Sequence, residues 1–215
     1  MKVILSFLFL FLLITGCQQE TQEQSPFTAQ TIDNDSVRTL FDEGPTRVVD
    51  LNYTEVTEEA LEVLAGLQVY NKDIERWFIR YYIETSEKGQ SFTPQEILNL
   101  AEERHEFESA WREYAYKEYG VEVTEEDIDS QVEYNVDVYE DFLPLAVQGM
   151  SKGLNLSFEE FIREFDRDYV ERTVLWQKLM PILLAKHHEE ESDRLDGVFL
   201  GQAYEKEVWK YVNNK

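Results

Sequence analysis

Apolar residues recur at intervals of three and four along most of the chain, which is the spacing of one face of an α-helix. The first such face predicts a single helix that ends within residues 87–91. Its members are Ala60, Leu64, Leu67, Tyr70, Ile74, Trp77, Phe78 and Tyr81. Before it, the sequence RVVDL at residues 47–51 is typical of one short strand.

Short capping motifs mark the next two helices. The sequence TPQE at residues 93–96 combines a capping box with proline at the first helical position, so we expect a second helix to begin there. Gly120 is suited to the left-handed residue that ends such a helix. The sequence TEED at residues 124–127 predicts the start of a third helix, which runs to just before Pro144.

A further capping box, SFEE at residues 157–160, predicts the longest helix of the chain. Helical spacing persists from there to Leu184, and Pro181 should kink the helix because proline lacks an N–H group. Residues 144–156 predict a short helical piece and a loop, and residues 198–212 predict a last short helix. The expected fold is all-α, with five or six helices, one of them long and kinked, and at most one short strand.

The N-terminus predicts a targeting signal. Lys2 precedes an apolar block at residues 3–14, which is shorter than the about 20 residues of a membrane-spanning helix. The sequence ITGC at residues 14–17 resembles the lipobox of bacterial lipoproteins, which implies cleavage before Cys17 and a lipid on its sulfur. Two acyl chains on one residue hold a protein stably at a membrane. The alternative is an ordinary cleaved signal beside a chance cysteine.

Three regions are therefore expected: a lipoprotein signal peptide at residues 1–16, a flexible tether at 17–44 and a single helical domain at 45–215. The tether is predicted from its polar composition, which cannot bury enough apolar surface to fold. The protein would then be anchored by lipid at the extracytoplasmic face of the cell membrane. Since Cys17 is the only cysteine, no disulfide can form within the chain.

The chain is strongly acidic, with 44 Asp and Glu against 20 Lys and Arg and a formal net charge of −24. Such a charge argues against nucleic-acid partners and against lying flat on anionic lipid, because both need Lys and Arg. It favours either basic partners and cations or simply a soluble, self-repelling surface. Aromatic residues make up 13% of the chain, which is ample for a core.

Two short motifs lie in the segment from about Phe92 to Lys186. The first consists of Ala115, Gly120, Val121, Val123, Thr124, Asp127, Ile128 and Asp129, and the second, looser one consists of Gly153, Leu154, Leu156, Phe158 and Phe161. With these motifs the segment resembles the N-terminal helical domain of the SurA and PrsA family of extracytoplasmic folding factors. The resemblance implies a bare client-binding domain without the parvulin-type isomerase of many family members, since 29 residues follow Lys186.

Candidate catalytic chemistry is sparse. Glu102 and His105 form one E-x-x-H pair, whereas a di-iron bundle needs two such pairs. His187 and His188 precede three glutamates, which is typical of a charged helix end. No G-x-S-x-G elbow or phosphate-binding glycine loop occurs. We therefore expect no enzyme activity, no metal site and no cofactor.

Six aromatic residues on the apolar faces are candidates for a peptide-binding groove, with a place in the core as the alternative. The expected function is chaperone-like, non-catalytic binding of unfolded or peptide-like segments, as the family resemblance implies. The alternative is a structural lipoprotein that docks one specific envelope partner. A metal-dependent enzyme is a third hypothesis. The six candidates are Trp77, Trp111, Tyr114, Phe165, Tyr169 and Trp176.

Overall fold

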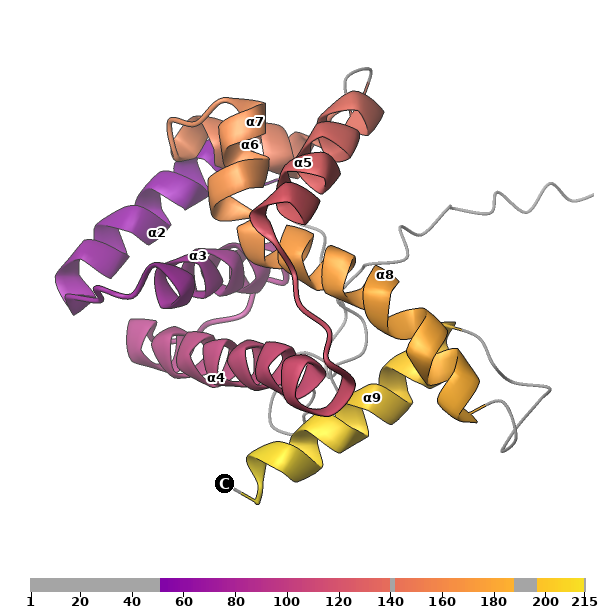
Figure 1. Cartoon of the computed structure of the whole chain (residues 1–215). Helices are drawn as coiled ribbons and strands as arrows, with labels where there is room; N and C mark the ends of the chain where they lie inside the picture. Colours follow the sequence, from indigo (N-terminus) through magenta and orange to yellow (C-terminus); the bar gives the residue numbers. More distant parts are fainter. Residues whose placement is uncertain (1–50, 140–141, 188–196, 215) are drawn as a thin grey trace, which may run out of the picture. The chain divides into compact units, whose positions relative to one another are not determined.

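The structure is a computed structural model that describes residues 51–139, 142–187 and 197–214. These residues form eight α-helices and one π-helical segment, without a strand among them, which confirms the all-α fold (Figure 1). The predicted number of five or six helices is too low, because two predicted helices are divided. The helices are α2 (Tyr53–Leu67), α3 (Lys72–Glu87), α4 (Pro94–Tyr119), α5 (Glu125–Tyr139), α6 (Leu145–Gly153), α7 (Phe158–Glu160), α8 (Arg167–His187) and α9 (Gly197–Val212), and the π-helical segment is η1 (Phe161–Phe165).

The predicted first helix is two helices, α2 and α3. Gln68 adopts a left-handed conformation with φ of 56°, which ends α2. Asn71 then caps α3, since its Oδ1 accepts hydrogen bonds from the backbone N–H groups of Asp73 at 2.9 Å and Ile74 at 3.4 Å. The apolar spacing continues across this turn because both helices bury residues in the same core. Periodicity alone therefore could not reveal the break.

The capping motifs place their helices as predicted. Thr93 and Glu96 form the expected reciprocal capping box at the start of α4. Gly120 ends α4 with φ of 64°, and α5 begins after Thr124, whose N–H donates to Asp127 at 2.8 Å. α6 lies within residues 144–156, where a short helical piece and a loop are predicted, and α9 begins one residue before the predicted range of 198–212. The predicted end of the third helix just before Pro144 is wrong, since α5 ends at Tyr139 and Phe142 and Leu143 are not helical.

The helix predicted to be the longest is divided into α7, η1 and α8, and α4 is longer than any of these parts, with 26 residues. The backbone turns out of helical geometry at Asp166, next to two carbonyl groups that accept from distant arginines. Arg76 Nη1 donates to Glu164 O at 2.8 Å, and Arg80 Nη2 donates to Phe165 O at 2.7 Å. These guanidinium groups replace the missing helical donors. Pro181 lies inside α8, which continues past it.

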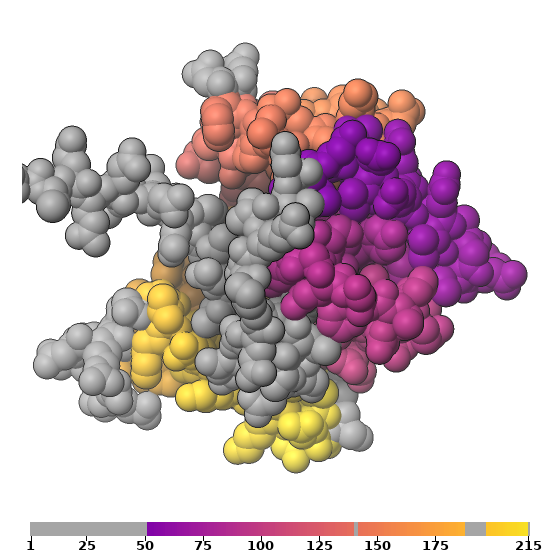
Figure 2. Space-filling view, turned by 180° about the vertical axis from the view of Figure 1, so that it is seen from behind, coloured from indigo at the N-terminus to yellow at the C-terminus, as the bar shows by residue number. Residues whose placement is uncertain are grey.

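Close packing of α6 on α2 fixes one end of the helical unit, and the two helices adjoin in both views (Figures 1 and 2). A Cβ atom added to Gly149 would lie 2.3 Å from Tyr53 Cβ, and one added to Gly153 would lie 2.6 Å from Thr57 Cβ. Only glycine permits such an approach of the two backbones. This contact positions α6 and the loop that follows it.

Two hydrophobic clusters form the core. One gathers α2, α3, the first part of α4, α5, η1 and the start of α8, and the other gathers the second part of α4, the rest of α8 and α9. Val123 packs against both clusters. No helix in the described ranges is both long enough and apolar enough to cross a bilayer.

Several predictions from the sequence lie outside the described residues. These are the signal peptide, Cys17, the tether and residues 47–50 of the proposed strand. Leu51 is described, and it precedes α2 without belonging to a strand. The described residues all belong to the compact unit Thr31–Lys215.

Candidate functional site

The six aromatic candidates belong to two separate sets. Trp77, Phe165 and Tyr169 pack in the cluster of α3, η1 and α8. The other set, Trp111, Tyr114 and Trp176, packs in the cluster of α4, α8 and α9. Three side chains are buried, those of Trp77, Trp111 and Phe165, and the other three are half-buried. The structure thus brings the candidates together in two groups around the core.

The first set surrounds the guanidinium group of Arg80. Its Cζ lies 4.6 Å from the ring centroid of Trp77, 4.9 Å from that of Phe165 and 4.2 Å from that of Tyr169. Such distances are those of cation–π contacts. The aromatic rings therefore shield a charge rather than face an open groove at this position.

Arg80 is also paired with two carboxylates. Its Nη1 and Nη2 donate to Asp168 at 2.6 and 2.7 Å, and Nη2 lies 3.1 Å from Asp166. Burial disfavours the ionised form of Asp168, but the charge and hydrogen bonds of Arg80 outweigh burial and hold its pKa below the usual value. Burial dominates at Asp166 and raises its pKa. The cluster is a buried ion pair that joins α3 to the η1–α8 junction.

A second ionic chain continues the first across α4, α8 and α9. Arg104 lies 4.6 Å from the Trp77 ring centroid and 2.8 Å from Glu108. Glu108 also pairs with Arg172, which stacks on Trp111 at 4.6 Å. Together these contacts link the two hydrophobic clusters through paired charges.

Sequence reasoning missed these charged residues, although a signal was present. Arg80 lies between Trp77 and Tyr81 on the apolar face of α3, and Glu108 lies beside Phe107 on α4. Charged residues inside an apolar stripe are buried only when they are paired. That pattern indicates an interior ionic network.

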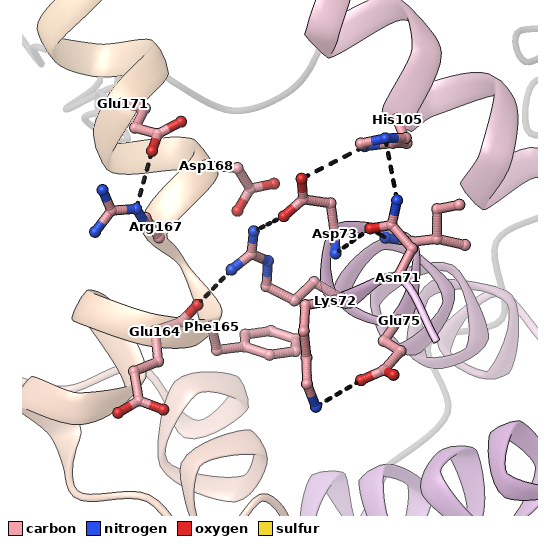
Figure 3. Close-up of polar contacts among 12 residues, drawn as sticks. Asn71, Lys72, Asp73, Glu75, His105, Glu164, Phe165, Arg167, Asp168 and Glu171 are labelled. Carbon is pink, nitrogen blue, oxygen red and sulfur yellow. Dashed lines mark hydrogen bonds and ion pairs between the residues drawn. The ribbon is translucent and has the colours of Figure 1, made fainter. Parts of the chain in front are cut away.

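The N-terminal end of α3 carries a polar cluster of its own (Figure 3). His105 Nδ1 lies 3.7 Å from Asp73 Oδ2, and His105 Nε2 lies 3.4 Å from Asn71 Nδ2. Glu102, its sequence partner in the E-x-x-H pair, is exposed on α4. Among the residues that the structure describes, no group of three potential metal ligands comes together. His188 lies outside that set.

A surface hollow of about 530 Å³ opens between α6 and the start of α7. Leu143, Leu156 and Phe158 supply its apolar lining. Amide, hydroxyl and ammonium groups supply the rest, from Gln148, Ser151, Lys152, Asn155 and Ser157. An apolar surface edged by hydrogen-bonding groups can hold a side chain together with the main chain that carries it.

Two residues close in sequence to the lining of this hollow have large, exposed apolar side chains. Phe142 is 75% exposed and Leu145 is 76% exposed, and they flank Leu143, which lines the hollow. Sequence reasoning missed this surface. The signal was present in the sequence FLPLAV at residues 142–147, where uncharged apolar residues surround a proline at the predicted end of the third helix.

The described lining of the hollow contains no His, Cys, Asp or Glu, and its charged side chain is that of Lys152. The resemblance to the SurA and PrsA helical domain stays a prediction from the sequence. No protein family model, no curated protein and no solved structure matches this chain.

Proposed function

We propose that this protein is anchored to the cell membrane by lipid on Cys17, faces away from the cytoplasm and binds unfolded or peptide-like segments without catalysing a reaction. The sequence supports the anchor through the resemblance of residues 14–17 to a lipobox. The resemblance of residues 92–186 to the SurA and PrsA helical domain supports the binding role.

The binding role is supported mainly by the hollow between α6 and α7, together with two exposed apolar residues that flank its lining residue Leu143 in the sequence. Phe142 and Leu145 offer area to an apolar side chain, and the amide groups of Gln148 and Asn155 offer partners to a peptide main chain. Exposed large apolar side chains beside a concave surface are common features of protein-binding sites. The proposed site is therefore this hollow rather than the six aromatic residues.

An aggregation assay tests the binding role. The protein should slow the aggregation of several unrelated denatured proteins at comparable molar ratios. The variant Phe142→Ser/Leu145→Ser should lose most of this effect, since both side chains are exposed and their replacement leaves the core intact. The matched control is Tyr70→Ser/Tyr116→Ser. It removes two exposed aromatic side chains, Tyr70 on the turn between α2 and α3 and Tyr116 on α4. Equal activity of parent and Phe142→Ser/Leu145→Ser would refute the proposed site.

A dedicated envelope partner is the second candidate. It is favoured by the burial of Trp77, Trp111 and Phe165, which leaves a small defined surface instead of a broad aromatic groove. A dedicated binder would leave aggregation of unrelated proteins unchanged and would retain one species in a pull-down. The same Phe142→Ser/Leu145→Ser variant should then lose that species.

The anchor is tested by Cys17→Ser. This variant should leave the membrane fraction, because the sulfur that carries the lipid is gone. A protein that stays with the membrane after this change has no lipid anchor at Cys17.

A further inference from the structure

The outer face of α5 carries two large apolar side chains that are more than half exposed. Tyr134 is 63% exposed and Val138 is 55% exposed, and they lie four residues apart on one face of the helix. The buried residues Ile128 and Val132 lie about 120° away around the helix axis, on the side of α5 that packs against η1 and α8. Figure 1 shows α5 at the margin of the described helices.

Acidic side chains run beside this apolar stripe. Glu126, Glu133 and Asp137 are exposed and lie on the neighbouring strip of the α5 surface. The other acidic residues of α5 are already paired, Glu125 with Arg167, Asp127 with Lys178 and Asp129 with Arg163. Within the described ranges, no ion pair reaches the three acidic residues of the outer strip.

The sequence offers no local cation to compensate them. No Lys, Arg or His occurs from Glu118 to Ser151, whereas the same stretch contains ten Asp and Glu residues. The pairs that hold α5 in place all come from η1 and α8, on its inner side. The outer acidic strip is therefore dispensable for the fold and open to a charge from outside the chain.

We propose that the outer face of α5 docks a basic polypeptide segment, whose apolar side chains cover Tyr134 and Val138 while its Lys or Arg residues meet Glu133 and Asp137. The apolar contact supplies the binding surface, and the acidic strip selects the class of segment that binds. Acidic groups beside the apolar contact raise the association rate of a basic segment and repel an acidic one. This inference rests on the proposed function and names the class of segment that the protein binds.

Three labelled peptides of equal length test the selection. The first alternates Leu with Lys, the second alternates Leu with Glu and the third alternates Ser with Lys. Their binding to the full chain in phosphatidylcholine nanodiscs is measured by fluorescence anisotropy, with empty nanodiscs as the blank. The Leu–Lys peptide should bind at least about tenfold more tightly than the other two, and rising salt should weaken it, since exposed charge pairs are screened.

Matched variants locate the binding. Glu133→Gln/Asp137→Asn should weaken Leu–Lys binding about three- to tenfold and reduce its salt dependence, the range expected for two exposed pairs. Tyr134→Ser/Val138→Ser should weaken it without reducing the salt dependence. Glu58→Gln/Glu62→Gln is the control, because it removes two exposed acidic groups at the same spacing on α2 and should leave binding unchanged.

The outcomes separate this inference from the proposed function. Equal losses in the α2 control and in Glu133→Gln/Asp137→Asn would mean that net charge alone attracts the peptide, and would overturn the inference. Loss of binding in Phe142→Ser/Leu145→Ser without any loss in the α5 variants would overturn the α5 site and leave the proposed function standing. A protein that binds none of the peptides and protects no denatured protein from aggregation refutes both.

Discussion

Replacing Gly149 by alanine tests the closest approach of two helices in the fold. The added Cβ would lie 2.3 Å from Tyr53 Cβ and 3.1 Å from the backbone nitrogen of Thr54. Carbon atoms in contact prefer about 3.5–4.0 Å, so α6 must move away from α2 by about 1 Å or more. Neither obstructing atom is the end of a flexible side chain, so neither can rotate out of the way.

The expected cost follows from two opposing effects. Forced overpacking of this kind costs about 1–3 kcal/mol, and the short distance places Gly149→Ala at the upper end. Alanine offsets about 1 kcal/mol of this because it is the better helix former. The net loss in the free energy of unfolding is about 2 kcal/mol, which is about 1 M in the urea midpoint for a slope near 2 kcal/mol per molar.

Urea unfolding followed by tryptophan fluorescence measures this loss. The substitution does not alter the immediate helix of any fluorophore, since Trp77, Trp111, Trp176 and Trp209 all lie outside α2 and α6. Gly66→Ala is the control. Gly66 lies in the last turn of α2 with nothing within 4 Å of its added Cβ, so the same substitution should raise stability by up to about 1 kcal/mol. Opposite signs for the two variants are the prediction. A Gly149→Ala protein as stable as its parent would refute the close approach of α2 and α6.

Three further substitutions test the local arguments. Asn71→Ala removes the cap of α3 and should lower the free energy of unfolding by about 1 kcal/mol in the same urea assay. Arg80→Met leaves two buried carboxylates without their partner and should cost about 3–5 kcal/mol, read as a fall in the urea midpoint without loss of helical circular dichroism in native buffer. Asp168 has a lowered pKa in the folded protein, so its contribution is present above the ordinary carboxyl pKa and is lost as pH falls through the lowered one. Asp168→Asn should therefore unfold with a shallower dependence on acid, and an unchanged acid profile would contradict the pairing with Arg80.

The starts of α4, α5 and α7 could be predicted because each is encoded within four consecutive residues. Thr93 and Glu96 satisfy each other's backbone N–H groups, and Ser157 and Glu160 do the same at the start of α7. Gly120 has the left-handed conformation that its position required. Such signals depend on local geometry alone, so the tertiary fold does not alter them.

The two helix breaks were missed for different reasons. Asn71 is a local cap, and its place two residues before Asp73 was a signal that the continuing apolar spacing concealed. The break at Asp166 had no local signal, because the groups that stabilise it come from far away in the sequence. Arg76 and Arg80 supply donors to carbonyls 88 and 85 residues further on. Only the tertiary fold brings them there.

The proposed binding site is the hollow and not the six aromatic residues, and the physical reason is visible in the sequence. An arginine three residues after Trp77 needs a buried counter-charge if the same face enters the core, and Arg80 finds it in Asp168. The rings of Trp77 and Phe165 are buried around it and that of Tyr169 is half-buried, so these rings contact a charged group. Residues 142–147 contain no charged group that would need a buried counter-charge, and Phe142 and Leu145 are exposed. An aromatic stripe that includes arginine thus indicates the interior of this protein, whereas its uncharged apolar turn at residues 142–147 indicates the exposed surface at which we propose binding.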